Sequence, residues 1–430
     1  MATDDRGRSG YADRPPGALS LQAARQRPVL RGPEERCDEE AMIDPLRAAR
    51  EDLDSVVELT RRLVRIPSRG GLDPYEPVLA CMSAWLGQRG LDCRQLAGPG
   101  GETVALTCEV PGARPGPRVV LDACLDTAPF GDEAAWTYPP ASGQITGGWL
   151  HGRGSSDSKA GAVIFAHLAA RRGGWAGSVV LLFDVDEHTG GFGGAKAYFE
   201  HAGPADAVMI GYPGPGHVIT GGRGVLRARV HVHAVAGHSG SARTGAGAIA
   251  KTAHLIQHLH QTPLPGPPGP GFPLPAKLTV TAISGGQGYS MVPDLCTVNV
   301  DIRLTPALEA GAAAALLHTA AADTDEAWPG TPPTGMDITT RWPPYALPDG
   351  SPLRDALLQG AARAGLAPVA KIAGPSNIGN YLAGLDIPAT AGFGVDHQGL
   401  HGTDERIRLD SIPPIQAACH YALLTLLHST

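Results

Sequence analysis

The chain has 430 residues, of which 43% are hydrophobic, 18% charged and 5% aromatic, and its formal net charge is −7. This composition is typical of a globular protein and excludes a disordered or collagen-like chain. The length predicts two or three domains and a core large enough for an enzyme. The apolar runs are far too short to span a bilayer, and no Lys/Arg cluster offers a site for phosphates. We therefore expect no association with membranes or nucleic acid.

The cysteines and the first 42 residues bear on the compartment. The seven cysteines are spread from Cys37 to Cys419 without a Cys-x-x-Cys pair. This argues against a disulfide framework and for a reducing compartment, so we expect a cytoplasmic protein. Residues 1–42 are rich in Arg, Asp, Gly and Pro and lack the apolar stretch of a signal peptide. We expect a disordered tail there, or a chain whose true start is Met42 rather than Met1.

Residues 43–216 alternate between helical and strand patterns. Apolar residues at helical spacing predict three helices, over 45–66, 77–89 and 161–172. Apolar runs predict four strands, over 104–110, 118–125, 178–185 and 207–211. This alternation predicts the α/β class with a doubly wound, mostly parallel sheet. Residues 335–430 return to the same style, with helices over 353–364 and 412–427 and strands over 368–372 and 388–393.

The pattern between residues 217 and 334 is different. Strands are predicted over 224–236, 277–284 and 294–304, and helices over 246–260 and 306–323. The order strand–helix–strand–strand–helix predicts a small α+β domain of ferredoxin-like type. We therefore expect a catalytic domain built from residues 43–216 and 335–430, with residues 217–334 inserted into it as a lid and dimerisation domain.

Polar residues gather where the buried strands end. They form four clusters, at residues 121–129, 152–159, 184–191 and 399–405. Each cluster taken singly is a weak signal, because an Asp after a strand is often a helix N-cap. Ligands of open α/β sheets bind at the carboxyl ends of the strands, and these clusters offer carboxylate, thiol and imidazole groups. Together the four clusters predict a metal site.

The motifs in these clusters resemble the M20 metallopeptidases, the group of aminoacylase, succinyl-diaminopimelate desuccinylase, acetylornithine deacetylase and glutamate carboxypeptidase. Residues 124–129 line up with the family's His-x-Asp-x-x-Pro, and residues 152–159 match its Gly-Arg-Gly-x-x-Asp-x-Lys. Residues 186–188 lie on its Asp-Glu-Glu motif, and His401 matches its C-terminal metal His. The resemblance covers residues 45–430 and implies a metal-dependent amidohydrolase that forms a homodimer through the inserted domain.

The ligand positions depart from the family pattern. The family holds two zinc ions bridged by an Asp, which is Asp157 here. The other positions of its first metal read Cys124 and Tyr212, and those of its second read His188 and His401. Thiolate binds zinc well, although a free Cys is as often a buried apolar residue. A tyrosine hydroxyl is a poor ligand, because binding costs a deprotonation.

Asp157, His188 and His401 nevertheless form a two-histidine, one-carboxylate set. Such a set, with one open position, is the usual arrangement of catalytic zinc. We therefore expect the second site to hold one Zn²⁺, with Co²⁺ or Mn²⁺ as alternatives, and the first site to be weakened or lost.

The resemblance also implies roles for neighbouring side chains. Glu187 matches the general base, and Asp126 matches the carboxylate that orients the first metal's His, a role put in doubt by Cys124. His238 matches a lid His that completes the partner subunit's active site, unless it is a strand-end His bonded locally. Arg303 matches an Arg that pairs with a substrate carboxylate, or else forms a surface ion pair.

Asn377 stands where the family often has Asp, which removes a negative charge and shifts preference away from cationic substrates. The expected function is cleavage of the amide bond of a small N-acylated amino acid or dipeptide by metal-activated water. The alternative is a metal-deficient protein of the same fold that binds a small ligand or partner, or catalyses altered chemistry. Glu187 beside three coordinating groups favours the enzyme, and Cys124 with Tyr212 favours the alternative.

Overall fold

The computed structural model describes residues 44–428 except 173, 242–244 and 246. The predicted tail, residues 1–42, lies outside the described residues. In the part that is described, no helix has both the length and the apolar character needed to cross a membrane.

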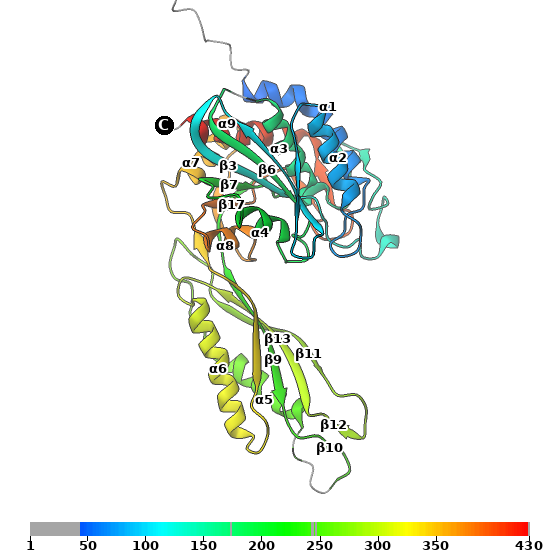
Figure 1. Ribbon diagram of the computed structural model, residues 1–430, viewed down its shortest axis with the longest axis vertical. Helices are drawn as coiled ribbons and strands as arrows, with labels where there is room; N and C mark the ends of the chain where they lie inside the picture. Colours follow the sequence, from blue (N-terminus) through cyan, green and yellow to red (C-terminus); the bar gives the residue numbers. More distant parts are fainter. Residues whose placement is uncertain (1–43, 173, 242–244, 246, 429–430) are drawn as a thin grey trace, which may run out of the picture. The chain divides into compact units, whose positions relative to one another are not determined.

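A mixed sheet forms the centre of the catalytic domain (Figure 1). Its strands, in spatial order, are β1 (Arg94–Ala97), β2 (Thr103–Pro111), β6 (Ala176–Asp184), β3 (Arg114–Cys124), β7 (Ala207–Ile210) and β17 (Ala389–Ala391). The pairs β6–β3, β3–β7 and β7–β17 are parallel, whereas β1–β2 and β2–β6 are antiparallel. The predicted α/β class with a largely parallel sheet is therefore confirmed.

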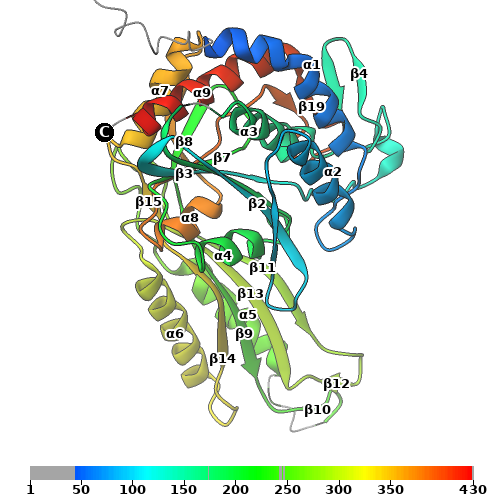
Figure 2. The ribbon, with the colours of Figure 1, turned by 45° about the horizontal axis from the view of Figure 1, so that its top comes forward.

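Helices cover both faces of this sheet, as the tilted view of Figure 2 shows. One face packs against α1 (Pro45–Val64), α2 (Glu76–Gly87), α3 (Ala160–Ala170), α7 (Pro352–Arg363) and α9 (Ile412–His428). The other packs against α4 (Gly193–Phe199) and α8 (Ile378–Ala383). Alternate residues of β3 enter the two cores, Leu121 one and Val120 the other. Burial on both faces explains the near-continuous apolar run in this strand.

Two small sheets flank the central one and carry loops of the site. The first consists of β15 (Tyr345–Ala346), β8 (His217–Gly222) and β16 (Val369–Ala373). The second consists of β18 (His397–Gln398), β19 (Arg406–Arg408), β5 (Trp149–His151) and β4 (Gln144–Thr146). The pairing of β19 with β5 sets Arg406 opposite His151. Segments far apart in the chain, near residues 151–157 and 401–406, therefore become neighbours. The remaining short helices are η2 (Glu133–Ala135), η3 (Ser155–Lys159) and η4 (Leu409–Ser411).

The inserted segment folds around its own antiparallel sheet. The sheet has the order β11 (Lys277–Gly285), β13 (Leu295–Leu304), β9 (Gly224–His233) and β14 (Gly335–Trp342). Helices α5 (Ala248–Gln261) and α6 (Ala310–Ala327) complete a β-α-β-β-α-β unit, the ferredoxin-like arrangement that the sequence predicts. A separate ladder joins β10 (Gly237–His238) to β12 (Met291–Val292).

The observed strand pairing places both ends of the inserted segment at positions that differ from the predicted 217 and 334. β8 pairs with β16 outside the inserted sheet, so residues 217–222 lie with the catalytic part. β14 pairs with β9 along residues 335–342, so this strand lies in the inserted sheet. The prediction missed it because residues 335–342 alternate between partly buried and exposed positions, the weak pattern of an edge strand.

Candidate active site

The site lies where two buried strands of the central sheet end. β3 ends at Cys124 and β6 at Asp184, and the parallel register sets these two residues side by side. The loop after β3 carries Asp126, and the loop after β6 carries Glu187 and His188. A parallel sheet brings the carboxyl ends of its strands to one edge, which is why two clusters distant in sequence meet here.

Asp157 is at the centre of three potential metal ligands. Its Oδ2 lies 2.6 Å from Nε2 of His401 and 3.4 Å from Nε2 of His188. The ligand atoms of these three residues all lie within 4.8 Å of one another. The structure thus brings together the two histidines and one carboxylate that the sequence proposed for the second metal position.

His188 is a buried imidazole without a hydrogen-bond partner. Only 5% of its side chain is exposed, and neither ring nitrogen makes a hydrogen bond to any described residue. Buried polar nitrogens normally have a partner, so this ring fits a metal ion on Nε2, the nitrogen facing Asp157. The types of ligand atom in this group and the unbonded His188 nitrogen therefore both fit a metal ion.

Asp126 holds His188 instead of the residue at position 124. Its carboxylate accepts hydrogen bonds from the backbone N–H groups of His188 (2.9 Å) and Glu187 (3.3 Å), and Oδ2 lies 3.5 Å from His188 Nδ1. A carboxylate behind a ligating His orients the ring and raises its basicity. Asp126 therefore adjoins His188, one of the residues predicted for the second metal position.

The Asp157 carboxylate and the two nearby imidazoles each favour the charged form of the other. Burial alone would raise the pKa of Asp157, but the adjacent imidazoles of His188 and His401 outweigh it and hold that pKa well below its usual range. Burial opposes a charged His188, yet Asp126 and Asp157 raise its pKa. The hydrogen bond to Asp157 raises the pKa of His401 as well. Burial raises the pKa of Glu187 to about 7.

A buried ion pair that sequence reasoning missed joins the loops of Asp157 and His401. Arg153 Nη1 donates to Glu405 Oε2 over 2.7 Å, and both side chains are almost fully buried. The other Glu405 oxygen accepts from the backbone N–H groups of Ser156 (3.0 Å) and Asp157 (3.3 Å), while Arg153 Nη2 donates to the carbonyl of His401 (3.3 Å). Both residues stand in the quoted clusters, but only their contact across the fold reveals their function.

The other half of the site has weaker ligands. Cys124 is buried, with Sγ 4.0 Å from Asp157 Oδ1, and it forms a second possible ligand group with Glu187 and His188. Burial raises the pKa of its thiol well above the usual range, which disfavours a free thiolate. Burial also raises the pKa of the Tyr212 hydroxyl, and the Asp157 carboxylate adds to this shift. Neither residue supplies an anionic ligand as readily as Asp157.

The three remaining candidates, His238, Arg303 and Asn377, make contacts with residues outside the predicted ligand set. Exposed His238 accepts a hydrogen bond from the Gly240 backbone over 3.1 Å, a local contact. The Arg303 guanidinium pairs with Asp301, with Nε and Oδ1 2.8 Å apart, and also donates to Ser376. The Asn377 side chain caps α8 by accepting from Gly379 N over 2.8 Å.

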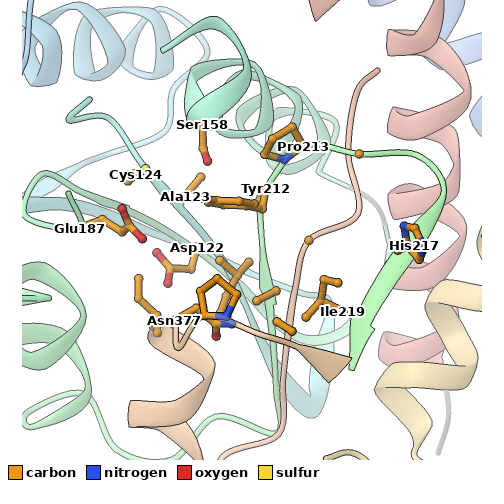
Figure 3. A pocket seen from close by; sticks show the side chains of 18 of the residues that line it. Asp122, Ala123, Cys124, Ser158, Glu187, Tyr212, Pro213, His217, Ile219 and Asn377 are labelled. Atoms are coloured by element: carbon orange, nitrogen blue, oxygen red, sulfur yellow. The ribbon is translucent and has the colours of Figure 1, made fainter. Parts of the chain in front are cut away.

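A cavity of about 360 Å³ opens beside these groups (Figure 3). Cys124, Glu187 and Tyr212 line it together with Asp122 and Asn377. Figure 3 shows Glu187 and Asp122 at one side of the cavity and His217 at the other. Burial, with a contribution from Glu187, raises the pKa of Asp122 to about 8. The sequence did not single out Asp122, because its place inside an apolar run gives no sign of a cavity.

Comparison with known proteins agrees with these motifs. Residues 120–425 match the description "Peptidase family M20/M25/M40". The chain is 27% identical over 375 residues to a succinyl-diaminopimelate desuccinylase of Cereibacter sphaeroides, covering 84% of this chain and 96% of the relative. It is 26% identical over 378 residues to the Paracoccus denitrificans enzyme of that name, covering 83% and 94%.

Solved structures share the fold. An aminopeptidase, PepT, from Bacillus cereus superimposes with a TM-score of 0.70 at 18% identity, covering 87% of this chain and 98% of that one. The YXEP protein of Bacillus subtilis, described as a dinuclear metal-binding peptidase, superimposes with a TM-score of 0.65 at 16% identity, covering 88% and 99%.

Proposed function

The chain belongs to peptidase family M20/M25/M40 and is a hydrolase, and we propose that it cleaves the amide bond of a small N-acylated amino acid or dipeptide. The observation that carries the proposal is Glu187 beside a complete ligand set of Asp157, His188 and His401. Relatives named succinyl-diaminopimelate desuccinylase support a substrate of this size and chemistry.

The metal of this proposal is one divalent ion, Zn²⁺ with Co²⁺ or Mn²⁺ as alternatives, held by Asp157, His188 and His401. His188 Nε2, which makes no hydrogen bond to any described residue, supports this assignment. When bound, such an ion activates a water molecule and polarises the scissile carbonyl. Asp126 positions the His188 ring from behind, and the ion pair of Arg153 and Glu405 holds the other two ligand loops together.

Glu187 performs the proton transfers of the proposed reaction. Its Oε2 lies 3.4 Å from His188 Nδ1, so the carboxylate is held beside the ligand set. It takes a proton from the attacking water and delivers it to the nitrogen of the leaving amine. Arg303 and Asn377 are proposed to contact the rest of the substrate. For Arg303, this requires its carboxylate partner Asp301 to share the guanidinium with a substrate carboxylate.

The experiment that tests the function combines metal analysis with a substrate panel. Purified protein should contain about one divalent ion per chain, because the structure offers one complete three-ligand set. It should release amine from N-acetyl or N-succinyl amino acids or from dipeptides, lose this activity with a chelator and regain it with Zn²⁺, Co²⁺ or Mn²⁺. A protein that binds no metal on dialysis against zinc would favour the alternative of a non-hydrolytic binding protein.

We also propose a homodimer formed through the inserted segment. Six of the exposed large apolar residues belong to this segment and form what we call the apolar patch: Val235, Ile249, Ile283, Tyr289, Met291 and Leu295. Strand β11 lies at the edge of its sheet as described. Exposed apolar surface and an open strand edge are features of protein interfaces.

A cytoplasmic location agrees with the six described cysteines, which are all free.

In the proposed dimer, His238 of one subunit acts at the active site of the other. His238 pairs with Met291 in the β10–β12 ladder, so it adjoins the apolar patch and lies near a second copy docked there. From that position it would hydrogen-bond the developing oxyanion in the partner subunit's site. Loss of such a donor costs about 10²- to 10³-fold in rate. A mixture of His238→Ala and Glu187→Gln chains should regain part of the activity, since one site of the heterodimer carries neither change. A mixture that exchanges subunits without regaining activity contradicts the shared site.

A further inference from the structure

Two of the free cysteines lie opposite each other at the edge of the central sheet. Strand β1 pairs with β2 in antiparallel register, with Arg94 opposite Thr107. This register, continued by one residue, places Cys93, just before β1, opposite Cys108 on β2. Residues opposite each other in an antiparallel pair have Cα atoms about 4.5–5.5 Å apart, and a disulfide spans about 4.4–6.8 Å. The backbone therefore holds the two cysteines at a distance that a disulfide can bridge.

The side chains of this pair also meet. Cys108 is buried in the core between the sheet and α2, and Cys93 packs against the same core. The Cys108 thiol donates a hydrogen bond to the sulfur of Cys93. Both thiols are free. Two cysteines whose side chains point apart cannot be joined without movement of the backbone, whereas these two already point toward each other.

The two thiols differ in exposure and in acidity. Cys93 is half-buried, and the hydrogen bond from Cys108 lowers its pKa. Cys108 is only 3% exposed. Its hydrogen bond to Cys93 raises the pKa of Cys108, and burial adds to this shift. The thiolate is the reactive form of a cysteine, so Cys93 is the thiol that meets a reactant from solvent. Cys108 lies behind it and reacts from inside the core.

We propose that Cys93 and Cys108 are a modification site, at which a small disulfide such as oxidised glutathione reversibly joins them. The Cys93 thiolate attacks the small disulfide, a mixed disulfide forms, and one glutathione thiolate leaves. The Cys93 sulfur is then uncharged and no longer opposes ionisation of Cys108. Cys108 gives up its proton and attacks the Cys93 sulfur, which releases the second glutathione thiolate. Two cysteine thiols are oxidised to one disulfide, and one glutathione disulfide is reduced to two thiols.

The disulfide joins the sheet edge to the strand that borders the candidate active site. β1 is the edge strand, and β2 lies between it and β6. The Val104 carbonyl at the start of β2 accepts a hydrogen bond from the Val185 backbone N–H, just after β6, over 3.0 Å. A covalent link from Cys93 to Cys108 closes a loop around the β1–β2 hairpin, so the oxidised hairpin should open less often. The proposal does not rest on the hydrolase reaction, because neither cysteine lines the cavity of the site.

The test treats the folded full chain with oxidised glutathione near neutral pH. Free thiols are then blocked with iodoacetamide in urea, and tryptic peptides are analysed by mass spectrometry. Trypsin cleaves after Arg94, so Cys93 and Cys108 fall in separate peptides, residues 90–94 and 95–118. These two peptides should be joined in most of the wild-type chains, and dithiothreitol should separate them. Thiols that both stay free, or a Cys93 that keeps glutathione without passing the disulfide on to Cys108, would overturn the proposal.

Two matched variants locate the reaction. Cys93→Ser removes the attacking sulfur, so it should abolish the joined peptides and leave buried Cys108 free of glutathione. Cys81→Ser removes another half-buried cysteine of the same core, whose sulfur accepts from Arg62 Nη2 over 3.5 Å, and it should keep the joined peptides. Their loss in folded Cys81→Ser would assign the attack to the wrong thiol and contradict the proposal. The wild-type measurement decides the question even where a variant folds poorly.

Hydrogen exchange tests the effect on the hairpin. Backbone amides of residues 94–108 should exchange about 10-fold more slowly in the oxidised wild type than in the reduced protein, because the closed loop opposes local opening. Cys93→Ser, treated with oxidised glutathione in the same way, should show no such change. A disulfide that forms without slowing exchange in this hairpin would contradict the expected restraint of β1.

Discussion

The two halves of the candidate site differ in how their ligands are supported. On one side, Asp157, His188 and His401 have converging ligand atoms, and each is fixed from behind by Asp126 or by the ion pair of Arg153 and Glu405. On the other, Cys124 and Tyr212 are neutral groups whose pKa values are raised by burial. This difference indicates that a candidate metal position is recognised by its supporting contacts as much as by its ligands.

The largest effect is expected from the base that works on the supported half. Glu187→Gln keeps the shape of the side chain and removes the proton acceptor. Turnover should fall about 10²- to 10⁴-fold, the usual contribution of general-base catalysis. Elemental analysis should find the metal content unchanged. Glu133→Gln, at an exposed position, is the control and should keep full activity. Normal turnover in Glu187→Gln would place the base elsewhere.

The comparison is tested most directly by removing one ligand from each half. His401→Ala takes away one of three converging ligands and should reduce the metal content from about one ion per chain to a small fraction. Cys124→Ala should leave it near the wild-type value, because the thiol is neutral and outside that set. Metal content after gel filtration checks both variants. Loss of the ion in Cys124→Ala as well would show that the thiol coordinates.

The supporting contact of His188 gives a smaller effect. Asp126→Asn weakens the carboxylate that orients the ring, and such changes cost about 10- to 100-fold in metal affinity. Competition with a chromophoric chelator measures this affinity. Asp132→Asn, in an exposed loop, is the matched control and should not change it. An unchanged affinity in Asp126→Asn would mean that the His188 ring is held by its packing alone.

The weak half can also be rebuilt. Cys124→His combined with Tyr212→Glu installs ligand types that the family uses at these positions, and the bridging carboxylate Asp157 is already present. Metal content should rise from about one towards two ions per chain, because the three-ligand requirement is then met on both sides. Titration with Zn²⁺ followed by elemental analysis gives the number. The single variant Tyr212→Phe is the control and should stay near one.

Local sequence patterns were sufficient to predict the main helices and strands and the kinds of candidate ligand. Buried strands and amphipathic helices have local signatures, so β3, β6, α1 and α9 were predicted within a few residues of their observed ends. The carboxyl ends of β3 and β6 in turn marked the place of Asp126, Glu187 and His188. The likeness to M20 peptidases and the ferredoxin-like order of the inserted segment followed from motifs and element order alone.

Which residues support one another depends on contacts between distant parts of the folded chain. The contact of His401 with Asp157 joins positions 244 apart in the chain, and that of Arg153 with Glu405 joins positions 252 apart. Asp126 turned out to hold His188, β14 joined the inserted sheet, and Asp122 faced a cavity. Local patterns record whether a residue is buried, but not which side chain meets it there. Those partners follow from long-range strand pairing and loop packing, which no short stretch of sequence encodes.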